Sequence, residues 1–371
     1  MKPLKKIFRV ILLTLNTLVL LCLVLSAFSE YISPYHFVFF SYLGLFFPFI
    51  LVGNIAVFLA WLLFKQWKLA LLHIVIFGIC GGAIYTYCPL HKKTQTIPDD
   101  AIKILTYNVM RFNGLSKNDP GNPPNKILQF IQENDADIVC IQEFGASKNN
   151  PNFLTEDDIM DALKKYPYNY FHSLQFPYQS EDFSLAIFSR FPILSSQKVP
   201  YDSPYNGSFE TELDINGKRV TLINNHLESN KLSIEERNNY YRLTTRDVDA
   251  QSLDAFTQTM TKRLTPAFKA RAFQAQVISR LIKENKNPYI IVCGDFNDTP
   301  ISYARHKIIG NDLRDAFVNS GFGLGITYNR YRFLFRIDYI LHSKNIQSYN
   351  CTVGNLKSSD HYPLWCYLQL N

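Results

Sequence analysis

The sequence predicts an α/β sandwich preceded by a helical membrane region. Three observations predict it: long uncharged apolar runs fill the first 93 residues, short β-rich runs recur after residue 101, and helical patterns lie between some of them. Of the 371 residues, 47% are hydrophobic and 19% are charged, which excludes a disordered chain or a basic low-complexity tail. We expect a membrane region at 1–93, a polar linker at 94–100 and a soluble domain at 101–371.

Each of the three apolar runs is long enough to cross a bilayer. They cover residues 10–29, 37–64 and 69–88, and a membrane-spanning helix needs about 20 apolar residues. The middle run is longer than this and contains Pro48, so we expect tilt or a kink near that residue. A cleaved signal peptide is the alternative for the first run, but its apolar core exceeds roughly 7–15 residues and two more runs follow. The sequence thus predicts three transmembrane helices.

The distribution of charge predicts how these helices are oriented. Residues 1–93 hold eight Lys and Arg against Glu30 alone, which accounts for the whole net charge of +7. Four of the bases precede the first run and two lie at 65–68, whereas the loop at 30–36 has none. The positive-inside rule therefore places the N-terminus in the cytoplasm and, after three crossings, the soluble domain in the periplasm or cell exterior. The lysines at 92–93 favour the opposite orientation, but they are outnumbered by the six basic residues that support this one.

Residues 94–371 are electrically neutral, with 30 basic and 30 acidic residues, so their bulk charge does not indicate nucleic acid. An amphipathic pattern predicts a helix over 126–133, and another predicts a helix over 273–282 with Pro266 near its start. The polar stretch 231–262 is compatible with a helix and is interpreted as an insertion or lid between two strands, or as a solvated linker helix. Mixed strands and helices around one core predict a layered α/β or α+β sandwich. The predicted strands are 102–107, 138–142, 185–188, 220–224, 289–292 and 339–341.

Polar residues gather where these predicted strands end or begin. Seen singly, an acid at a strand end is more often an exposed cap than a ligand, but an ordered series of such positions favours a site at one sheet edge. The series lacks a nucleophilic Ser or Cys beside a base, and its oxygen ligands suit Mg²⁺ or Mn²⁺ better than zinc. With a hard cation present, phosphate is the expected electrophile. The residues are Asn108, Glu143, His226, Asp295, Asn297, Asp338, Asp360 and His361.

At these residues the chain resembles the endonuclease/exonuclease/phosphatase superfamily, which includes deoxyribonuclease I-like nucleases, abasic-site endonucleases, secreted sphingomyelinases and inositol polyphosphate phosphatases. The resemblance covers about residues 101–371 and depends on Gly-Asp-Phe-Asn at 294–297 and Ser-Asp-His at 359–361, together with the earlier Asn and Glu. It implies a four-layer α/β sandwich, in which two mixed β-sheets pack face to face with helices outside. It also implies Glu143 as the principal metal ligand, assisted by Asn108 and completed by Asp360.

The resemblance assigns the chemistry to the remaining residues. Asp295 positions or deprotonates the attacking water, and Asn297 holds this water and the phosphate. Asp338 orients His361, which contacts the scissile phosphate or acts as acid or base. His226 donates to a phosphate oxygen or to the leaving group, so that it binds substrate as Asn297 and Asn108 do.

The branch of the superfamily is narrowed by the residues beside the site. Met110 stands where abasic-site endonucleases usually carry an acid, and Asn225-His226-Leu227 resembles the deoxyribonuclease and sphingomyelinase branches. The leading hypothesis is a membrane-anchored phosphodiesterase acting on nucleic acid or phospholipid headgroups, with no protein partner. A phosphomonoesterase on a small phosphorylated ligand and a catalytically silent phosphate-binding sensor are the alternatives.

Three further features are left open by the sequence. The aromatic and basic segment 328–333 with Arg336 is interpreted either as a phosphate or base contact or as an exposed hairpin. Arg271 is expected to be a solvated or core-bordering charge. Asn206 is a weak indication of the superfamily's middle strand.

Overall fold

Two six-stranded mixed sheets form the soluble part of the molecule in the computed structural model. In one, the strand order is β11-β12-β1-β2-β4-β3, and in the other it is β5-β6-β7-β8-β10-β9. The first sheet comprises β1 (Ile102–Asn108), β2 (Ile138–Phe144), β3 (Tyr168–Ser173), β4 (Ser184–Ser189), β11 (Ile346–Val353) and β12 (Leu364–Leu370). The second comprises β5 (Ile193–Lys198), β6 (Gly207–Ile215), β7 (Lys218–His226), β8 (Tyr289–Asp295), β9 (Leu313–Asp315) and β10 (Asp338–Ser343).

The structure describes most of the chain. Between the described strands, β1 pairs with β2 in parallel and β7 with β8 in parallel, and the other pairings are antiparallel. Each sheet therefore has one central pair of strands whose carboxyl ends point to the same edge. The described residues are 2–117, 125–148, 150, 152–173, 184–201, 203, 206–231, 233, 236, 250–330 and 334–371.

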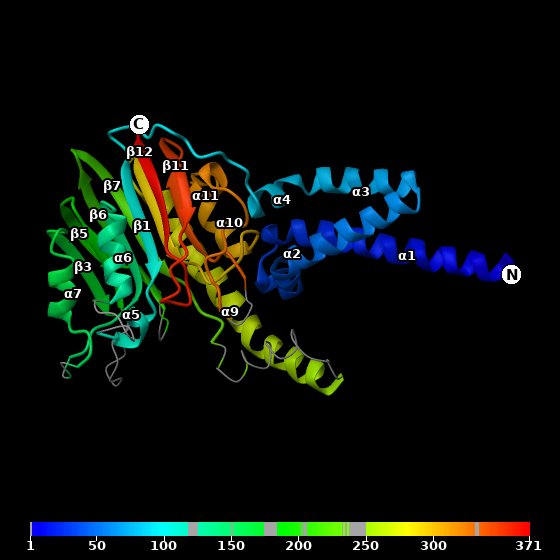
Figure 1. The fold of residues 1–371 in the computed structure, drawn as a ribbon, viewed down its shortest axis with the longest axis horizontal. Coiled ribbons are helices and arrows are strands. Elements are labelled where there is room, and N and C mark those ends of the chain that lie inside the picture. Colours follow the sequence, from blue (N-terminus) through cyan, green and yellow to red (C-terminus); the bar gives the residue numbers. More distant parts are fainter. Residues whose placement is uncertain are drawn as a thin grey trace.

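The sheets pack face to face and are covered by helices on their outer faces (Figure 1). Alternating side chains such as Ile104, Cys140, Leu222 and Cys293 fill the space between the sheets. The opposite face of the first sheet packs against α6 (Lys126–Asn134) and α7 (Glu156–Ala162). The opposite face of the second packs against α9 (Ala250–Glu284) and α10 (Tyr303–Ile309). The four-layer α/β sandwich is thereby confirmed; the short helices α5 (Met110–Leu115) and α11 (Ala316–Ser320) complete it.

Helix α9 differs from the prediction. Pro266, expected near the helix start, lies in its interior, because the helix already begins at Ala250. The expected insertion 231–262 therefore ends in the first turns of α9, while residues 237–249 lie outside the described residues. The predicted helix at 126–133 is present as α6, which Asn125 caps by accepting from the backbone N–H groups of Ile127 and Leu128.

The N-terminal apolar runs form α1 (Lys2–Ala27), the short η1 (Ser29–Tyr31), α2 (Pro34–Leu63), α3 (Trp67–Ile79) and α4 (Gly81–Tyr87). Two helices, α1 and α2, are long and apolar enough to cross a membrane. The third expected span is broken, because α3 and α4 meet at an angle of 66° near Cys80. The structure thus contains two candidate spans, or three if the bent pair is one span, instead of three plain helices. Pro48, near which tilt or a kink is expected, lies inside α2, and the residue of α2 with non-helical backbone angles is Phe37.

The apolar helices are joined to the sandwich at one end of their bundle (Figure 1). Ile301, in the loop after β8, is fully buried against Leu23 of α1, Phe47 of α2 and Tyr87 at the end of α4. The Ser29 hydroxyl donates to the carbonyl oxygen of Ile301 over 3.3 Å. The N-terminus lies at the far end of the bundle, away from the sandwich (Figure 1).

Candidate active site

The polar residues at the strand ends meet at one edge of the two sheets. In the second sheet, the register places His226 beside Asp295, and Asp295 beside Asp338. Asp338 begins its strand where Asp295 ends another, because β10 runs antiparallel to β8. In the first sheet, Asn108 is the last residue of β1 and Glu143 lies one residue before the end of β2.

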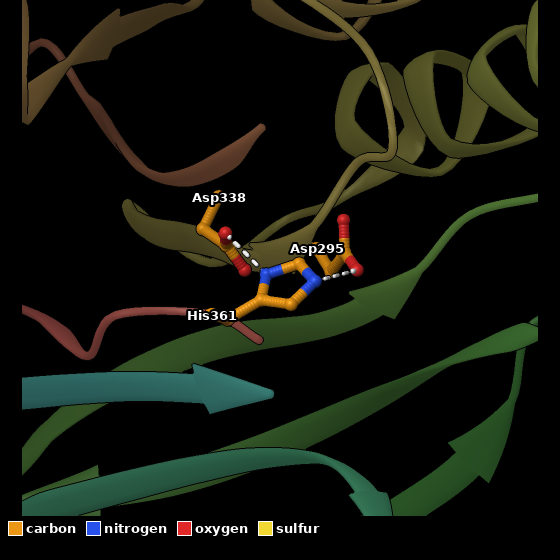
Figure 2. Close-up of side chains that lie close together, drawn as sticks. All are labelled: Asp295, Asp338 and His361. Carbon is orange, nitrogen blue, oxygen red and sulfur yellow. Dashed lines mark hydrogen bonds and ion pairs between the residues drawn. The ribbon is translucent and has the colours of Figure 1, made fainter. Parts of the chain in front are cut away.

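His361 lies between two buried carboxylates (Figure 2). Its Nδ1 is 2.8 Å from Oδ2 of Asp338, and its Nε2 is 3.6 Å from Oδ2 of Asp295. Burial opposes a charged imidazole, but the two carboxylates outweigh this effect and raise the pKa of His361 to about 10. At neutral pH His361 is therefore an imidazolium held in one orientation by Asp338.

His226 has the opposite electrostatic character. Its Nε2 lies 3.6 Å from Oδ2 of Asp295 and 3.8 Å from Oε1 of Glu143. Burial lowers the pKa of His226 in spite of the Asp295 charge. A neutral ring facing two carboxylates through Nε2 carries its proton there, so His226 is a donor at the site.

Asp295 is the point on which these groups converge. Its Oδ2 also accepts a hydrogen bond of 3.2 Å from the amide nitrogen of Asn108, while its Oδ1 accepts from the backbone N–H of Asn297 over 2.8 Å. Burial raises the pKa of Asp295 to about 6. A carboxylate of this basicity is ionised above pH 6 and accepts a proton more readily than an exposed aspartate does.

The backbone at the site is held in conformations that side chains rarely adopt. Glu143 and Asn297 both have φ of 52°, in the left-handed region. Gly294 has φ of 122°, and a Cβ there would lie 2.0 Å from the carbonyl oxygen of Asn225 on the neighbouring strand. Asn297 is further fixed by donating from its amide nitrogen to the carbonyl oxygen of Leu227 over 3.0 Å. These backbone restraints fix the positions of the Glu143 and Asn297 side chains at the site.

A hard cation fits the donor chemistry of this edge. The Glu143 side chain is 27% exposed and lines the same cavity as Asp360, so that both offer carboxylate oxygens. Asn108 instead presents its amide nitrogen, which donates to Glu143 over 3.3 Å, while its amide oxygen accepts from the backbone N–H of Met110. Asn108 becomes an oxygen ligand only if the amide turns over and gives up the bond to Met110.

Asp295, Asp338 and His361 form a second group that could hold a metal ion, because one ligand atom of each lies within 4.8 Å of the others. The close pairing of His361 with Asp338 favours an orienting hydrogen bond at that end of the group. The donor atoms at this edge therefore permit a divalent cation but do not identify it.

A cavity of about 560 Å³ extends from this edge of the sheets. It reaches the site residues Glu143, His226, Asp295, Asn297, Asp360 and His361, whereas Asn108 and Asp338 lie behind them. Sequence reasoning missed its other wall, because that wall comes from helices whose packing no strand pattern reveals. The residues of this wall are Phe39, Tyr42, Leu45, Phe46 and Phe49 of α2, with Thr257, Thr261, Leu264, Phe268 and Arg271 of α9.

Known families match both parts of the chain. A model described as the Endonuclease/Exonuclease/phosphatase family matches residues 105–361. The chain belongs to this family. Residues 6–87 match a separate model, described as a domain of unknown function (DUF8431). No curated protein sequence matches the chain.

Solved structures of the endonuclease/exonuclease/phosphatase family resemble this one. The protein from Beutenbergia cavernae DSM 12333 has 15% sequence identity and a TM-score of 0.50, over 73% of this chain and 72% of that one. The Bacteroides vulgatus family protein has 16% identity and a TM-score of 0.49, over 73% and 99% of the two chains. The human Nocturnin catalytic domain with bound sulfate has 15% identity and a TM-score of 0.49, over 74% and 97%. At such identities the likeness concerns the fold alone.

Two arginines of the endonuclease/exonuclease/phosphatase domain are structural. Arg271, expected at the solvent or the edge of the core, is 1% exposed, and its Nε donates to Asp298 over 3.0 Å. Arg336 is 2% exposed and stacks on Phe317, so it is no exposed phosphate contact. Tyr328 lies 5.1 Å from the His361 ring, and residues 331–333 of that segment lie outside the described residues.

Asn206 lines the cavity and supports the loop after β7. Its amide nitrogen donates to the carbonyl oxygen of Leu227 over 3.0 Å. Asn297 donates to the same carbonyl oxygen, so both amides hold the chain just beyond His226.

Proposed function

We propose that the protein is a membrane-anchored phosphodiesterase that depends on a divalent metal ion and cleaves its substrate by attack of water on phosphorus. The observation that carries this proposal is the convergence of three nitrogens, from Asn108, His226 and His361, on Oδ2 of Asp295 beside Glu143. One buried oxygen that can take up a proton thus lies beside two histidines that can donate hydrogen bonds to a phosphate, and one of these carries a positive charge. Membership of a family of phosphoester hydrolases supports the same chemistry.

Each residue has a role that its environment favours. Asp295 accepts the proton of the attacking water, and the backbone N–H of Asn297 holds its other oxygen in place. The His361 imidazolium, fixed by Asp338, neutralises charge on a non-bridging phosphate oxygen. His226 donates from Nε2 to the phosphate or the leaving group.

Glu143 and Asp360 are proposed to hold Mg²⁺ or Mn²⁺, with Asn108 beside them. When bound, such a cation supplies charge neutralisation at the phosphate and orients the substrate. The chain's own contribution is to hold these carboxylates at the open end of the site, opposite the buried proton acceptor.

The assignment is tested with the full chain in nanodiscs and bis-p-nitrophenyl phosphate as substrate. Hydrolysis is expected with Mg²⁺ or Mn²⁺ and is expected to cease with a chelator. p-Nitrophenyl phosphate, plasmid DNA and RNA serve as parallel substrates, and preference for the monoester would indicate a phosphomonoesterase. No hydrolysis of any substrate would contradict the proposal and favour a silent phosphate sensor.

We also propose that residues 1–93 are the membrane region, 94–100 the connection and 101–371 the catalytic domain, with the N-terminus in the cytoplasm and the catalytic domain outside it. The placement of basic residues supports this orientation. A C-terminal alkaline phosphatase fusion should be active in cells. An inactive but stable fusion would overturn the orientation.

A further inference from the structure

The cavity has two walls of different chemistry. One wall carries the acids and histidines of the proposed catalytic site, including Asp295 and His361. The other wall is a stripe of α2, formed by Phe39, Tyr42, Phe46 and Phe49. Their spacing of three and four residues places them on one face of the helix. A single cavity therefore joins a site suited to phosphate with an aromatic helical face.

The aromatic wall belongs to a candidate membrane span. Helix α2 is 30 residues long and apolar enough to cross a membrane. The stripe lies between its sixth and sixteenth residues, toward the end of the bundle that adjoins the sandwich. Phe39, Phe46 and Phe49 keep 60%, 44% and 57% of their surface exposed. The cavity thus extends from the catalytic residues to the side of a helix suited to the interior of a bilayer.

Contacts with α9 fix the position of this wall. The Tyr42 hydroxyl lies 2.8 Å from the Thr265 hydroxyl, and the Tyr42 ring packs edge-on against Phe268 at 5.3 Å between centroids. Val38 and Leu45 pack against Leu264 and Phe268 in the same junction. Because α9 also packs on the second sheet, the stripe is held at a set position relative to the catalytic edge.

The charges around the cavity disfavour a polyanion. Among the described residues that line it, Lys231 and Arg271 are its Lys and Arg side chains. Both are already paired, Lys231 with Glu228 and Arg271 with Asp298. A nucleic acid strand would meet no row of unpaired cations in this part of the chain, although it would meet aromatic rings. One phosphate attached to an apolar chain matches both walls.

We propose, on the basis of the phosphodiesterase function above, that the substrate is a phosphodiester lipid. Its scissile phosphate lies between Glu143, Asp295 and His361, and its aliphatic chain lies along the stripe of α2. Hydrolysis by water breaks one phosphorus–oxygen bond and gives a phosphomonoester and an alcohol, with the proton from water passing through Asp295 to the alcohol. The cavity volume of about 560 Å³ falls within the range of small-ligand sites.

A homologous series of alkyl p-nitrophenyl phosphates tests the proposal, with methyl, butyl, octyl and dodecyl esters kept below their micelle concentrations. The full chain in nanodiscs is used with Mg²⁺ throughout. Each buried methylene of the alkyl group is expected to raise kcat/KM up to about fourfold, until the alkyl group covers the whole stripe. A plateau after the methyl ester, with the methyl ester still hydrolysed, would overturn the lipid proposal and leave the phosphodiesterase intact. Loss of hydrolysis of every ester would instead overturn both.

Substitutions in α2 test where the alkyl chain of the substrate binds. Phe46→Ala and Phe49→Ala are expected to lower the ratio of dodecyl to methyl kcat/KM about tenfold each. Phe64→Ala is the matched control, because Phe64 is 71% exposed at the C-terminal cap of the same helix and does not line the cavity. It should leave the ratio unchanged. An equal fall in all three variants would contradict the stripe as the binding surface, and faster hydrolysis of single-stranded DNA than of the dodecyl ester would favour nucleic acid instead.

Discussion

The two sheets contribute different chemistry to one site. Each supplies residues from the carboxyl ends of its parallel pair of strands, Asn108 and Glu143 from the first sheet and His226 and Asp295 from the second. The Glu143 side chain is 27% exposed, whereas that of Asp295 is 1% exposed. An open carboxylate suits a cation that arrives from solvent, while a buried one suits proton transfer. The two parallel strand pairs are arranged alike, but the carboxylates at their ends differ in burial. One therefore suits cation binding and the other suits proton transfer.

A buried hydrogen bond joins the sheets just below the site. The Gln142 amide nitrogen donates to the Asn224 amide oxygen over 2.7 Å, and both side chains are fully buried. Asn224 in turn donates to the backbone carbonyl oxygens of Ile141 and Ala186 in the first sheet. The distance between the two chemical halves is thus fixed by polar contacts in an otherwise apolar core.

The largest expected effect is the loss of the open carboxylate. Glu143→Ala should reduce metal-dependent hydrolysis of bis-p-nitrophenyl phosphate by about 10³-fold or more, because the proposed cation loses its principal ligand. Mg²⁺ binding, measured by calorimetry, should weaken in parallel, while circular dichroism stays unchanged. Glu284→Ala, an exposed glutamate at the end of α9, is the control. Full activity in Glu143→Ala would place the cation elsewhere.

Removing the buried carboxylate of Asp295 tests the part of the site that the second sheet contributes. Asp295→Asn should lower kcat by about 10³-fold, since the amide cannot accept the proton from water. In the parent protein, activity should fall as the pH drops through about 6, where Asp295 becomes protonated. An unchanged pH–rate profile in the variant would show that another group is the base.

The same variant should be more stable than the parent in a chelator at pH 8. Burial raises the pKa of Asp295, so the protonated form is favoured by folding, and this stability is present below pH 4 and lost as the pH rises through 6. Asparagine resembles the neutral acid at every pH. Thermal unfolding at pH 4 and pH 8 measures the difference, which should vanish at the lower pH.

Asp338→Asn is expected to have a smaller effect of about 10²-fold at pH 8. Without this carboxylate the pKa of His361 falls from about 10, so the imidazolium is lost as the pH rises through neutrality. The defect should therefore shrink at pH 6, where the ring is protonated again. Asp312→Asn, at an exposed position, is the matched control. A defect independent of pH would indicate that Asp338 acts only on structure.

The smallest effect on activity is expected at the contact between the sheets. Gln142→Leu leaves the buried amide oxygen of Asn224 without its donor and should lower the free energy of unfolding by about 1–3 kcal/mol. Gln142→Leu combined with Asn224→Leu should recover part of this loss, because neither partner is then left unpaired. Denaturant unfolding of the two single variants and the double variant measures the coupling. Additive losses would mean that the hydrogen bond does not join the sheets energetically.

Much of the fold and of the polar site was predictable from the sequence. The runs that became β1, β2, β4, β7, β8 and β10 are buried and apolar, and such runs are visible without a structure. The site residues are adjacent to these runs, so the prediction that they gather at one edge follows from strand direction. The structure brings Asn108, Glu143, His226, Asp295, Asp338 and His361 into contact.

The remaining features depend on contacts between segments distant in sequence. Phe46 and Phe49 look like ordinary bilayer-facing residues until α2 is seen beside α9. Arg271 looks like a surface charge until Asp298 is placed next to it, and Gln142 gives no sign of its partner Asn224. The bend at Cys80 was not predictable either, because hydropathy continues across it.

The connection between the apolar helices and the sandwich is held by specific hydrogen bonds and is not a flexible tether. The Asn350 side chain binds both the N–H and the carbonyl oxygen of Thr94, and His91 donates its backbone N–H to Gly321. Together with the packing of Ile301, these bonds leave the sandwich little freedom to turn relative to the helical bundle. With the proposed membrane anchoring, the active site would reach only the membrane surface next to the bundle, and encounters with a lipid substrate would be governed by lateral diffusion in two dimensions.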